Sequence, residues 1–268
     1  MDTNDSGKTS AVRRPLAYKD DRFIDSPDAR GLRILSEYLE PLSHFKREQV
    51  RDTIVFFGSA RVTENGPMAR YYNDARELAK LLTEWSEEIR QHSRRFVVCT
   101  GGGPGIMEAA NRGAADAHGK TVGLNIRLPF EQLPNPFISP ELSFEFHYFF
   151  MRKFWFAYLA KALIVFPGGF GTMDELFEVL TLVQTQKLRK KMAVILYGTT
   201  FWNEVLNFEA LIKHGMISPE DVKLFRMADS PAEAFEILKT DLATHYLRPK
   251  DELPARELET PSIAQSVT

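Results

Sequence analysis

Two carboxylates stand just after a run of glycines in the stretch from Val165 to Glu178. Glu175 and Glu178 are three residues apart, so on a helix they lie on one face about one turn apart. The segment from Pro167 to Thr172 holds three glycines, and the pattern that follows it is helical. A glycine turn that leads into a helix presents backbone N–H groups to an anion. An anion site beside paired acids indicates chemistry on a phosphorylated substrate.

The residues on either side of this turn predict the elements that position it. Ala162 to Phe166 is a short apolar run with the β-branched residues of a buried strand. After the turn, apolar residues recur at the spacing of one helix face: Leu176, Val179, Leu180 and Val183. We therefore expect a strand, a glycine turn and a helix N-terminus, in that order.

A cationic pair, Arg152-Lys153, lies fifteen residues before Pro167-Gly168. It stands among aromatic residues that are typical of a core-facing helix, namely Phe149, Phe150, Phe154, Trp155, Phe156 and Tyr158. A buried arginine without a partner is costly, so Arg152 should face a carboxylate or a ligand anion. One helix and one strand between the pair and the turn would bring Arg152 back to the same edge.

Strands and helices alternate along the chain, which is typical of an α/β fold with helices on both faces of a doubly wound parallel sheet. Strands are expected at 53–57, 96–100, 121–126, 143–147, 162–166 and 192–197, and helices at 68–89, 106–117, 149–160, 172–186, 201–214 and from 231 to 238. Ligands of such sheets bind beyond the carboxyl ends of the strands. Glycine turns at 58, 101–105 and 168–171 all follow predicted strands.

The chain divides by composition into three parts. Residues 1–50 form an N-terminal extension, residues 51–247 a single α/β domain, and residues 248–268 a polar C-terminal tail. Residues 1 to about 25 are charged and lack apolar periodicity, so they are expected to be disordered or loosely attached. An amphipathic helix then follows Ser26-Pro27, with Leu32, Leu35 and Leu39 at helical spacing. Pro41 is expected to end or kink this helix, whose apolar face must cover the core domain or a partner subunit.

Composition excludes several classes of function. The hydrophobic content of 44% is ordinary for a globular protein, and the net charge of −2 gives no electrostatic case for nucleic acid or an anionic membrane. The N-terminus lacks the apolar region of a signal peptide, and no run approaches the roughly 18 apolar residues of a membrane span. We expect a soluble cytoplasmic protein. The single cysteine, Cys99, lies in an apolar run and is interpreted as a buried structural thiol.

Other chemistries lack their motifs. The histidines are scattered without metal-ligand spacing, so neither a metal nor another cofactor is expected. The turn at 101–105 does not satisfy G-x-G-x-x-G because position 106 is Ile, and no G-x-S-x-G elbow is present. His118-Gly119-Lys120-Thr121 resembles the end of a P-loop, but Ala114 replaces the first glycine and the order runs from helix to strand.

The motifs together resemble the LOG (Lonely Guy) family. Pro167 to Glu178 matches in full the family signature P-G-G-x-G-T-x-x-E-x-x-E, and Met151-Arg152-Lys153 stands where the family has its Arg-Lys pair. Gly101–Gly105 resembles the second glycine turn of the family and Phe57-Gly58-Ser59 the first, so the resemblance covers about residues 51–200. It implies a Rossmann-like fold, dimers or larger assemblies, and hydrolysis of a nucleoside 5′-monophosphate to free base and ribose 5-phosphate. Family members act on cytokinin ribotides, on AMP, or on both. Many relatives were labelled lysine decarboxylases, yet no part of this sequence resembles a pyridoxal phosphate site.

By this resemblance, Arg152 and Glu175 are the catalytic pair. The substrate-binding residues it implies are Ser59, Gly102, Gly103, Glu131, Lys153, Gly168, Gly169, Gly171, Thr172 and Glu178. Glu175 would stabilise the oxocarbenium-like transition state and deprotonate the attacking water. Arg152 would hold that carboxylate ionised or neutralise the departing base, and Glu178 would support or orient Glu175.

Two other functions compete with hydrolysis. A nucleotide-binding sensor or carrier without turnover would need the same phosphate turn, but the presence of both Arg152 and Glu175 favours an enzyme. A structural interaction module would draw only on the N-terminal helix and leaves the glycine turns unexplained. The expected partners are a nucleoside 5′-monophosphate and further copies of this chain, in a homodimer or larger assembly. The base that is released stays open.

Overall fold

The computed structural model describes residues 14–128, 133–188 and 190–247. Within these ranges, seven parallel strands form one sheet in the order β4-β3-β2-β1-β5-β6-β7. The strands are β1 (Thr53–Phe57), β2 (Val97–Thr100), β3 (Thr121–Ile126), β4 (Ser143–Phe146), β5 (Ala160–Val165), β6 (Ala193–Tyr197) and β7 (Arg226–Ala228). The predicted α/β fold with a doubly wound parallel sheet is confirmed.

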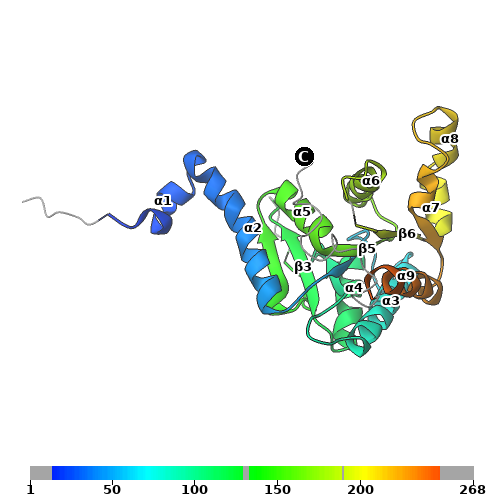
Figure 1. Ribbon diagram of the computed structural model, residues 1–268, viewed down its shortest axis with the longest axis horizontal. Coiled ribbons are helices and arrows are strands. Elements are labelled where there is room, and N and C mark those ends of the chain that lie inside the picture. Colours follow the sequence, from blue (N-terminus) through cyan, green and yellow to red (C-terminus); the bar gives the residue numbers. More distant parts are fainter. Residues whose placement is uncertain (1–13, 129–132, 189, 248–268) are drawn as a thin grey trace, which may run out of the picture.

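Helices cover both faces of the sheet (Figure 1). They are α1 (Asp21–Ile24), α2 (Arg30–Arg47), α3 (Ala69–Glu88), α4 (Ile106–Asp116), α5 (Phe149–Leu159), α6 (Phe170–Gln184), α7 (Thr199–Val205), α8 (Phe208–Lys213) and α9 (Pro231–Tyr246). All five residues of β1 are buried, and their side chains alternate between the two faces of the sheet, so a layer of helices must cover each face. Ile54 and Phe56 join the core under α3, α4 and α9, whereas Val55 and Phe57 join the core under α2, α5, α6 and α7.

The strand order reverses between β1 and β5, which is where ligands bind in sheets of this kind. The pairing of Phe57 with Val165 sets the two strand ends side by side. Beyond them, the N–H of Ser59 donates to the carbonyl of Pro167 at 3.0 Å, and the N–H of Ile106 donates to the carbonyl of Ser59 at 3.1 Å. Ser59 therefore links the first glycine turn, at residue 58, to the second, at 101–105, and to the third, at 168–171.

Helix α2 runs through Pro41 to Arg47, so Pro41 does not end this helix, which was one of the two expected outcomes. Proline has no N–H to donate to the carbonyl four residues earlier, which here belongs to Glu37. The indole Nε1–H of Trp155 in α5 donates to that carbonyl instead, at 2.9 Å. A tertiary hydrogen bond thus satisfies the backbone group that the proline leaves without a helical partner.

Three further boundaries differ from the sequence-based expectation. The single helix expected over 201–214 is two helices, α7 and α8, because Leu206 is extended and the Asn207 side chain caps α8 by accepting from the N–H of Ala210. Helix α9 begins at its Ser230 cap as expected but continues past Leu238 to Tyr246. Strand β7 was not expected, since three residues are too short to show a pattern. The C-terminal tail at 248–268 lies outside the described residues.

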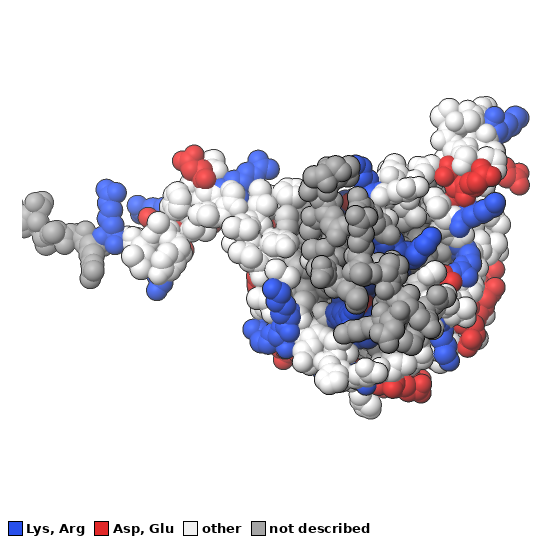
Figure 2. Space-filling view, in the orientation of Figure 1, with Lys and Arg blue, Asp and Glu red and all other residues white. Residues whose placement is uncertain are grey.

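Acidic and basic side chains are interspersed over the visible face of the described residues, as the small net charge suggests (Figure 2). None of the helices in the described ranges is long and apolar enough to cross a membrane. Cys99 on β2 is buried, and burial raises the pKa of its thiol, as expected for a structural cysteine.

Candidate active site

The predicted order of strand, glycine turn and helix is confirmed around the Pro167–Glu178 segment. Strand β5 ends at Val165, Gly169 is the N-cap of α6, and the helix begins at Phe170. The first turn of α6 buries Thr172, and the next turn buries Glu175. The helical period thus points Glu175 inward toward the sheet.

Helix α5 brings Arg152 to the same place. Its Nη2 lies 3.6 Å from Oε1 of Glu175, and the two side chains are only 14% and 8% exposed. The guanidinium lies over two aromatic rings, 5.3 Å from the ring centre of Phe149 and 5.6 Å from that of Phe156. Its Nε atom is buried and has no hydrogen-bond partner among the described residues. The carboxylate that Arg152 was expected to face is therefore Glu175.

Burial dominates the electrostatics of this pair. It raises the pKa of Glu175 to about 7, although the positive charges of Lys153 and Arg152 act in the opposite direction. Burial also lowers the pKa of Arg152, which Glu175 and Asp174 oppose. A carboxyl group with a pKa near neutrality can exchange a proton with water or substrate at physiological pH. Glu175 has the properties of a general acid or base.

Lys153 occupies the centre of a second ionic group. Its Nζ lies 2.7 Å from Oδ2 of Asp174 and 2.7 Å from Oε2 of Glu178. Burial alone would lower the pKa of Lys153, but the hydrogen bonds to Asp174 and Glu178 raise it overall. Glu178 thus contacts Lys153, while its negative charge contributes to the raised pKa of Glu175. Asp174 is missing from the sequence-based set, because an exposed acid near the N-terminus of a helix is ordinary on its own.

The glycines of the third turn differ in their surroundings. A side chain at Gly168 would overlap the side chain of Thr172, whereas nothing lies within 4 Å of the Cβ position at Gly169 or Gly171. Among the described residues, no hydrogen bond engages the N–H groups of Gly171 and Thr172. Unpaired N–H groups at a helix N-terminus, in a turn whose glycines leave room around the backbone, are suited to an anion.

The second turn is built differently. Gly102 and Gly103 are both buried, and the carbonyl of each accepts from Nδ2 of Asn135 at 3.1 Å. Gly102 has a φ of +74°, in the left-handed region, and a side chain there would overlap Asn125. Asn135 also donates to Oδ1 of Asn111 at 2.9 Å. Sequence reasoning missed these asparagines. Asn125, a polar residue inside a predicted buried strand, is the one that carried a signal.

The structure therefore unites most of the predicted site. Helices α5 and α6 bring together two neighbouring ion pairs, one between Arg152 and Glu175 and one between Lys153 and Glu178. Ser59 and the three glycine turns meet at the same sheet edge. Glu131 lies outside the described residues.

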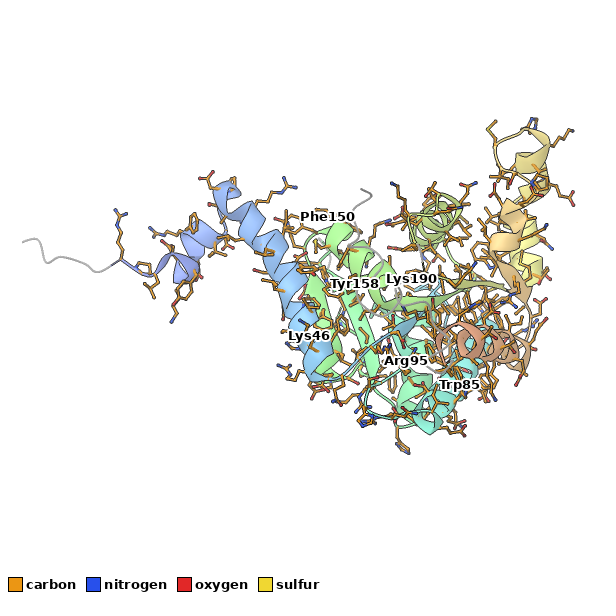
Figure 3. All side chains as sticks on the ribbon, viewed as in Figure 1. Lys46, Trp85, Arg95, Phe150, Tyr158 and Lys190 are labelled. Carbon is orange, nitrogen blue, oxygen red and sulfur yellow. The ribbon has the colours of Figure 1, made fainter. Side chains whose placement is uncertain are left out.

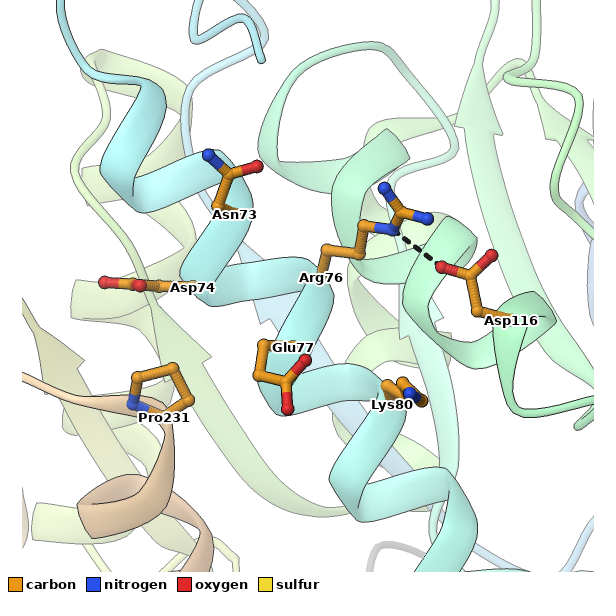
Figure 4. A pocket seen from close by; sticks show the side chains of 7 residues that line it. All are labelled: Asn73, Asp74, Arg76, Glu77, Lys80, Asp116 and Pro231. Carbon is orange, nitrogen blue, oxygen red and sulfur yellow. Dashed lines mark hydrogen bonds and ion pairs between the residues drawn. The ribbon is translucent and has the colours of Figure 1, made fainter.

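A hollow of about 510 Å³ lies elsewhere, beside α3 and the start of α9 (Figure 4). It is lined by Asn73, Asp74, Arg76, Glu77, Lys80, Asp116 and Pro231. Arg76 is paired with Asp116 at 2.6 Å, so its charge is already partnered. Because α3 and α9 cover the sheet face opposite to α5 and α6, this hollow is separate from the Arg152–Glu175 pair.

The fold and the site define a Rossmann-like α/β protein with an anion-type turn beside a buried Arg–Glu pair. The family model described as "Possible lysine decarboxylase" matches residues 107–238. The chain is 27% identical over 214 residues to a probable cytokinin riboside 5′-monophosphate phosphoribohydrolase of Oryza sativa subsp. japonica, which covers 76% of this chain and 88% of that protein. These matches confirm the predicted resemblance to the LOG family.

Two further comparisons are more limited. A pyrimidine/purine nucleotide 5′-monophosphate nucleosidase of Escherichia coli strain K12 is 31% identical over 103 residues, which is 34% of this chain and 21% of that protein. A crystal structure from a structural genomics consortium has a TM-score of 0.51 at 22% identity and covers 70% of this chain and 99% of its own. That likeness shows the fold alone. The names of these relatives, a phosphoribohydrolase and a nucleosidase, both describe hydrolases that act on nucleotide monophosphates.

Proposed function

We propose that this chain hydrolyses the N-glycosidic bond of a nucleoside 5′-monophosphate and releases free base and ribose 5-phosphate. The observation that carries the proposal is the buried pair of Arg152 and Glu175, 3.6 Å apart, on helices that begin at the ligand-binding edge of the sheet. The names of the rice and Escherichia coli relatives support the same reaction.

Glu175 acts as the base. The oxygen of a water molecule attacks C1′ of the ribose as the bond from C1′ to the base nitrogen breaks. The electron pair of that bond leaves with the base, which takes a proton from solvent. Glu175 takes the proton of the attacking water and later returns it to solvent. A negative carboxylate also stabilises the positive charge that develops on the ribose. A pKa of about 7 gives Glu175 a large ionised fraction at neutral pH and enough basicity to take a proton.

Arg152 favours the ionised form of Glu175. Its positive charge lowers the carboxyl pKa against the opposing effect of burial, so removing it would leave Glu175 protonated to a higher pH. Lys153 acts in the same direction while it remains fixed by Asp174 and Glu178. The two cations keep a buried carboxylate available as a base.

The turn from Gly168 to Thr172 holds the 5′-phosphate. The unpaired N–H groups of Gly171 and Thr172 and the open space at Gly169 fit an anion there. Binding energy from a phosphate that does not react positions the ribose against Glu175. AMP and cytokinin ribotides are the substrates to test first, and we expect the protein to act in the cytoplasm as a homodimer or larger assembly.

The test is base release by the purified chain. It is incubated with AMP, GMP, CMP, UMP and a cytokinin ribotide, and free base and ribose 5-phosphate are measured by chromatography. We expect release from at least one monophosphate and much slower release from the matching nucleoside, which lacks the phosphate. Binding of these nucleotides in calorimetry without base release from any of them would favour the sensor or carrier instead.

A further inference from the structure

Glu37 of helix α2 contacts the helix that carries Arg152 through both its backbone and its side chain. Its carboxylate accepts from the N–H of His147 at 2.8 Å and from the N–H of Tyr148 at 3.2 Å, just before α5 begins. Its carbonyl accepts from the indole of Trp155 two turns later. We propose that Glu37 is a positioning residue that sets where Arg152 stands relative to Glu175. This proposal rests on the proposed function of that pair.

The link from Glu37 to Arg152 is short. Tyr148 is the N-cap residue of α5, and its carbonyl accepts from the N–H of Arg152 at 3.2 Å. The N–H of Tyr148 donates to the Glu37 carboxylate, and the carbonyl of the same residue accepts from the N–H of Arg152. The early N–H groups of a helix lack intrahelical partners, and a negative charge at this end interacts favourably with the helix dipole. The carboxylate of Glu37 supplies both the acceptor and the charge.

The docking of α2 on α5 is specific along its length. The ring of Tyr38 stacks on Trp155 with centroids 5.7 Å apart, and Phe45 packs against the same indole at 5.3 Å. At the other end of α5, the ammonium of Lys190 donates to the carbonyl of Tyr158 at 2.9 Å (Figure 3). Burial lowers the pKa of Lys190, which fits a side chain enclosed against the helix end. Helix α5 is therefore held at both ends and on one side.

This gives the N-terminal extension a role at the candidate site. Helix α2 lies before the region that the family model matches, which begins at residue 107. The extension was expected to cover the core domain or a partner subunit. In the described residues it covers α5, with Tyr38 and Phe45, and through Glu37 it reaches the first turn in which Arg152 lies. The apolar face expected from Leu32, Leu35 and Leu39 is not the one that packs, since these leucines are about half exposed.

The test compares Glu37→Ala and Glu37→Gln with a control, Glu40→Ala, which removes an exposed acid from the same helix. Two properties are measured without substrate: amide hydrogen exchange of residues 149–152, and the titration of the Glu175 carboxyl by ¹³C NMR. We expect Glu37→Ala to speed exchange in this segment by roughly fivefold. The Glu175 titration should also move to higher pH, because Arg152 is held less well. Glu37→Gln, which keeps an acceptor but loses the charge, should show a smaller change of the same sign.

The control should match the wild type in both measurements. A purely structural role for Glu37 would lower the melting temperature and leave the Glu175 titration in place, and that result would overturn the proposal. If Glu37→Ala does not fold, Glu37→Gln alone decides by the same titration. Because neither readout needs turnover, failure here is distinct from failure of the base-release assay with wild-type protein.

Discussion

The guanidinium of Arg152 and the carboxylate of Glu175 lie 3.6 Å apart, within ion-pair distance but beyond a good hydrogen bond. Both groups are shielded from water, where a charge is costly unless it is well paired. The raised pKa of Glu175 beside a cation shows that burial outweighs the attraction in this pair. An ion pair with an incomplete hydrogen bond leaves the carboxylate oxygens open to a further partner, such as a water molecule.

Glu175→Gln should fold and bind AMP but lose base release by roughly a hundredfold or more. The amide keeps the size of the side chain and removes the oxygen that accepts the proton. Single-turnover base release and calorimetric AMP binding check the two halves of the prediction. Turnover close to that of the wild type would remove Glu175 from its catalytic role.

The pH dependence of kcat/KM should report the same group. A base with a pKa of about 7 is protonated and inactive below this pH, so kcat/KM should rise with pH through about 7 and level off above it. Glu178→Gln should shift this rise to lower pH, since the Glu178 charge raises the pKa of Glu175. A pH profile that is flat between pH 5 and 8 would contradict the prediction.

Stability should depend on pH in the opposite sense. The pKa of Glu175 is raised from an ordinary value of 4.5 to about 7 in the folded protein, so the folded state binds a proton that the unfolded state releases. The resulting stabilisation is complete below about pH 4.5 and is lost as the pH rises through about 7. This stabilisation amounts to about 3 kcal/mol, because a pKa difference of one corresponds to roughly 1.36 kcal/mol.

Urea denaturation at pH 5 and pH 8 measures this term. From pH 5 to pH 8, the unfolding free energy of the wild type should decrease more than that of Glu175→Gln, because the glutamine side chain does not titrate. Equal changes in both proteins would mean that Glu175 has its ordinary pKa in the folded state.

The glycines of the third turn should respond differently to alanine. Gly171→Ala places a methyl group in open space within a helix, so stability should rise by up to about 1 kcal/mol while AMP binding weakens. Gly168→Ala meets Thr172 and should destabilise the start of α6. Thermal melts and AMP titrations of the two variants separate these effects. Unchanged AMP binding by Gly171→Ala would place the phosphate elsewhere.

Asn135→Ala should cost both stability and substrate affinity. It removes the side-chain donor shared by the buried carbonyls of Gly102 and Gly103. The Gly102 carbonyl still accepts from the backbone N–H of residue 135, but the Gly103 carbonyl loses this partner, and a buried acceptor without a partner costs about 1–3 kcal/mol. The second turn then loses its fixed shape, so KM for the nucleotide should rise more than kcat falls. Asn73→Ala is a suitable control, because Asn73 lines the hollow on the other face of the sheet. A KM equal to that of the wild type would separate the second turn from substrate binding.

Local patterns were enough to predict the strands other than β7, the glycine turns and the helix that carries Glu175 and Glu178 on one face. Proline and glycine mark turns, and the helical period shows which positions share a face. The sequence could also indicate that Arg152 needs an anionic partner, because a buried guanidinium without one is costly.

Features that depend on distant contacts could not be predicted in this way. Helix α2 passes Pro41 because Trp155, more than a hundred residues later, bonds the carbonyl that the proline leaves free. The break before α8 depends on the side chain of Asn207, and polar residues such as Asn135 show no period that would mark them as buried. Local propensity is overridden at each of these positions by a specific hydrogen bond.

The position of β1 at the centre of the sheet affects how the molecule is made. One edge of β1 pairs with β2, and its other edge pairs with β5. Strand β5 begins at Ala160, about a hundred residues further along the chain, so the second pairing forms only after that segment has been synthesised. Until those residues leave the ribosome, a strand that is apolar from Ile54 to Phe57 keeps an open edge that other chains can join. Fragments that end before Ala160 should therefore aggregate, and the edge that holds the glycine turns should be among the last parts of the molecule to form during synthesis.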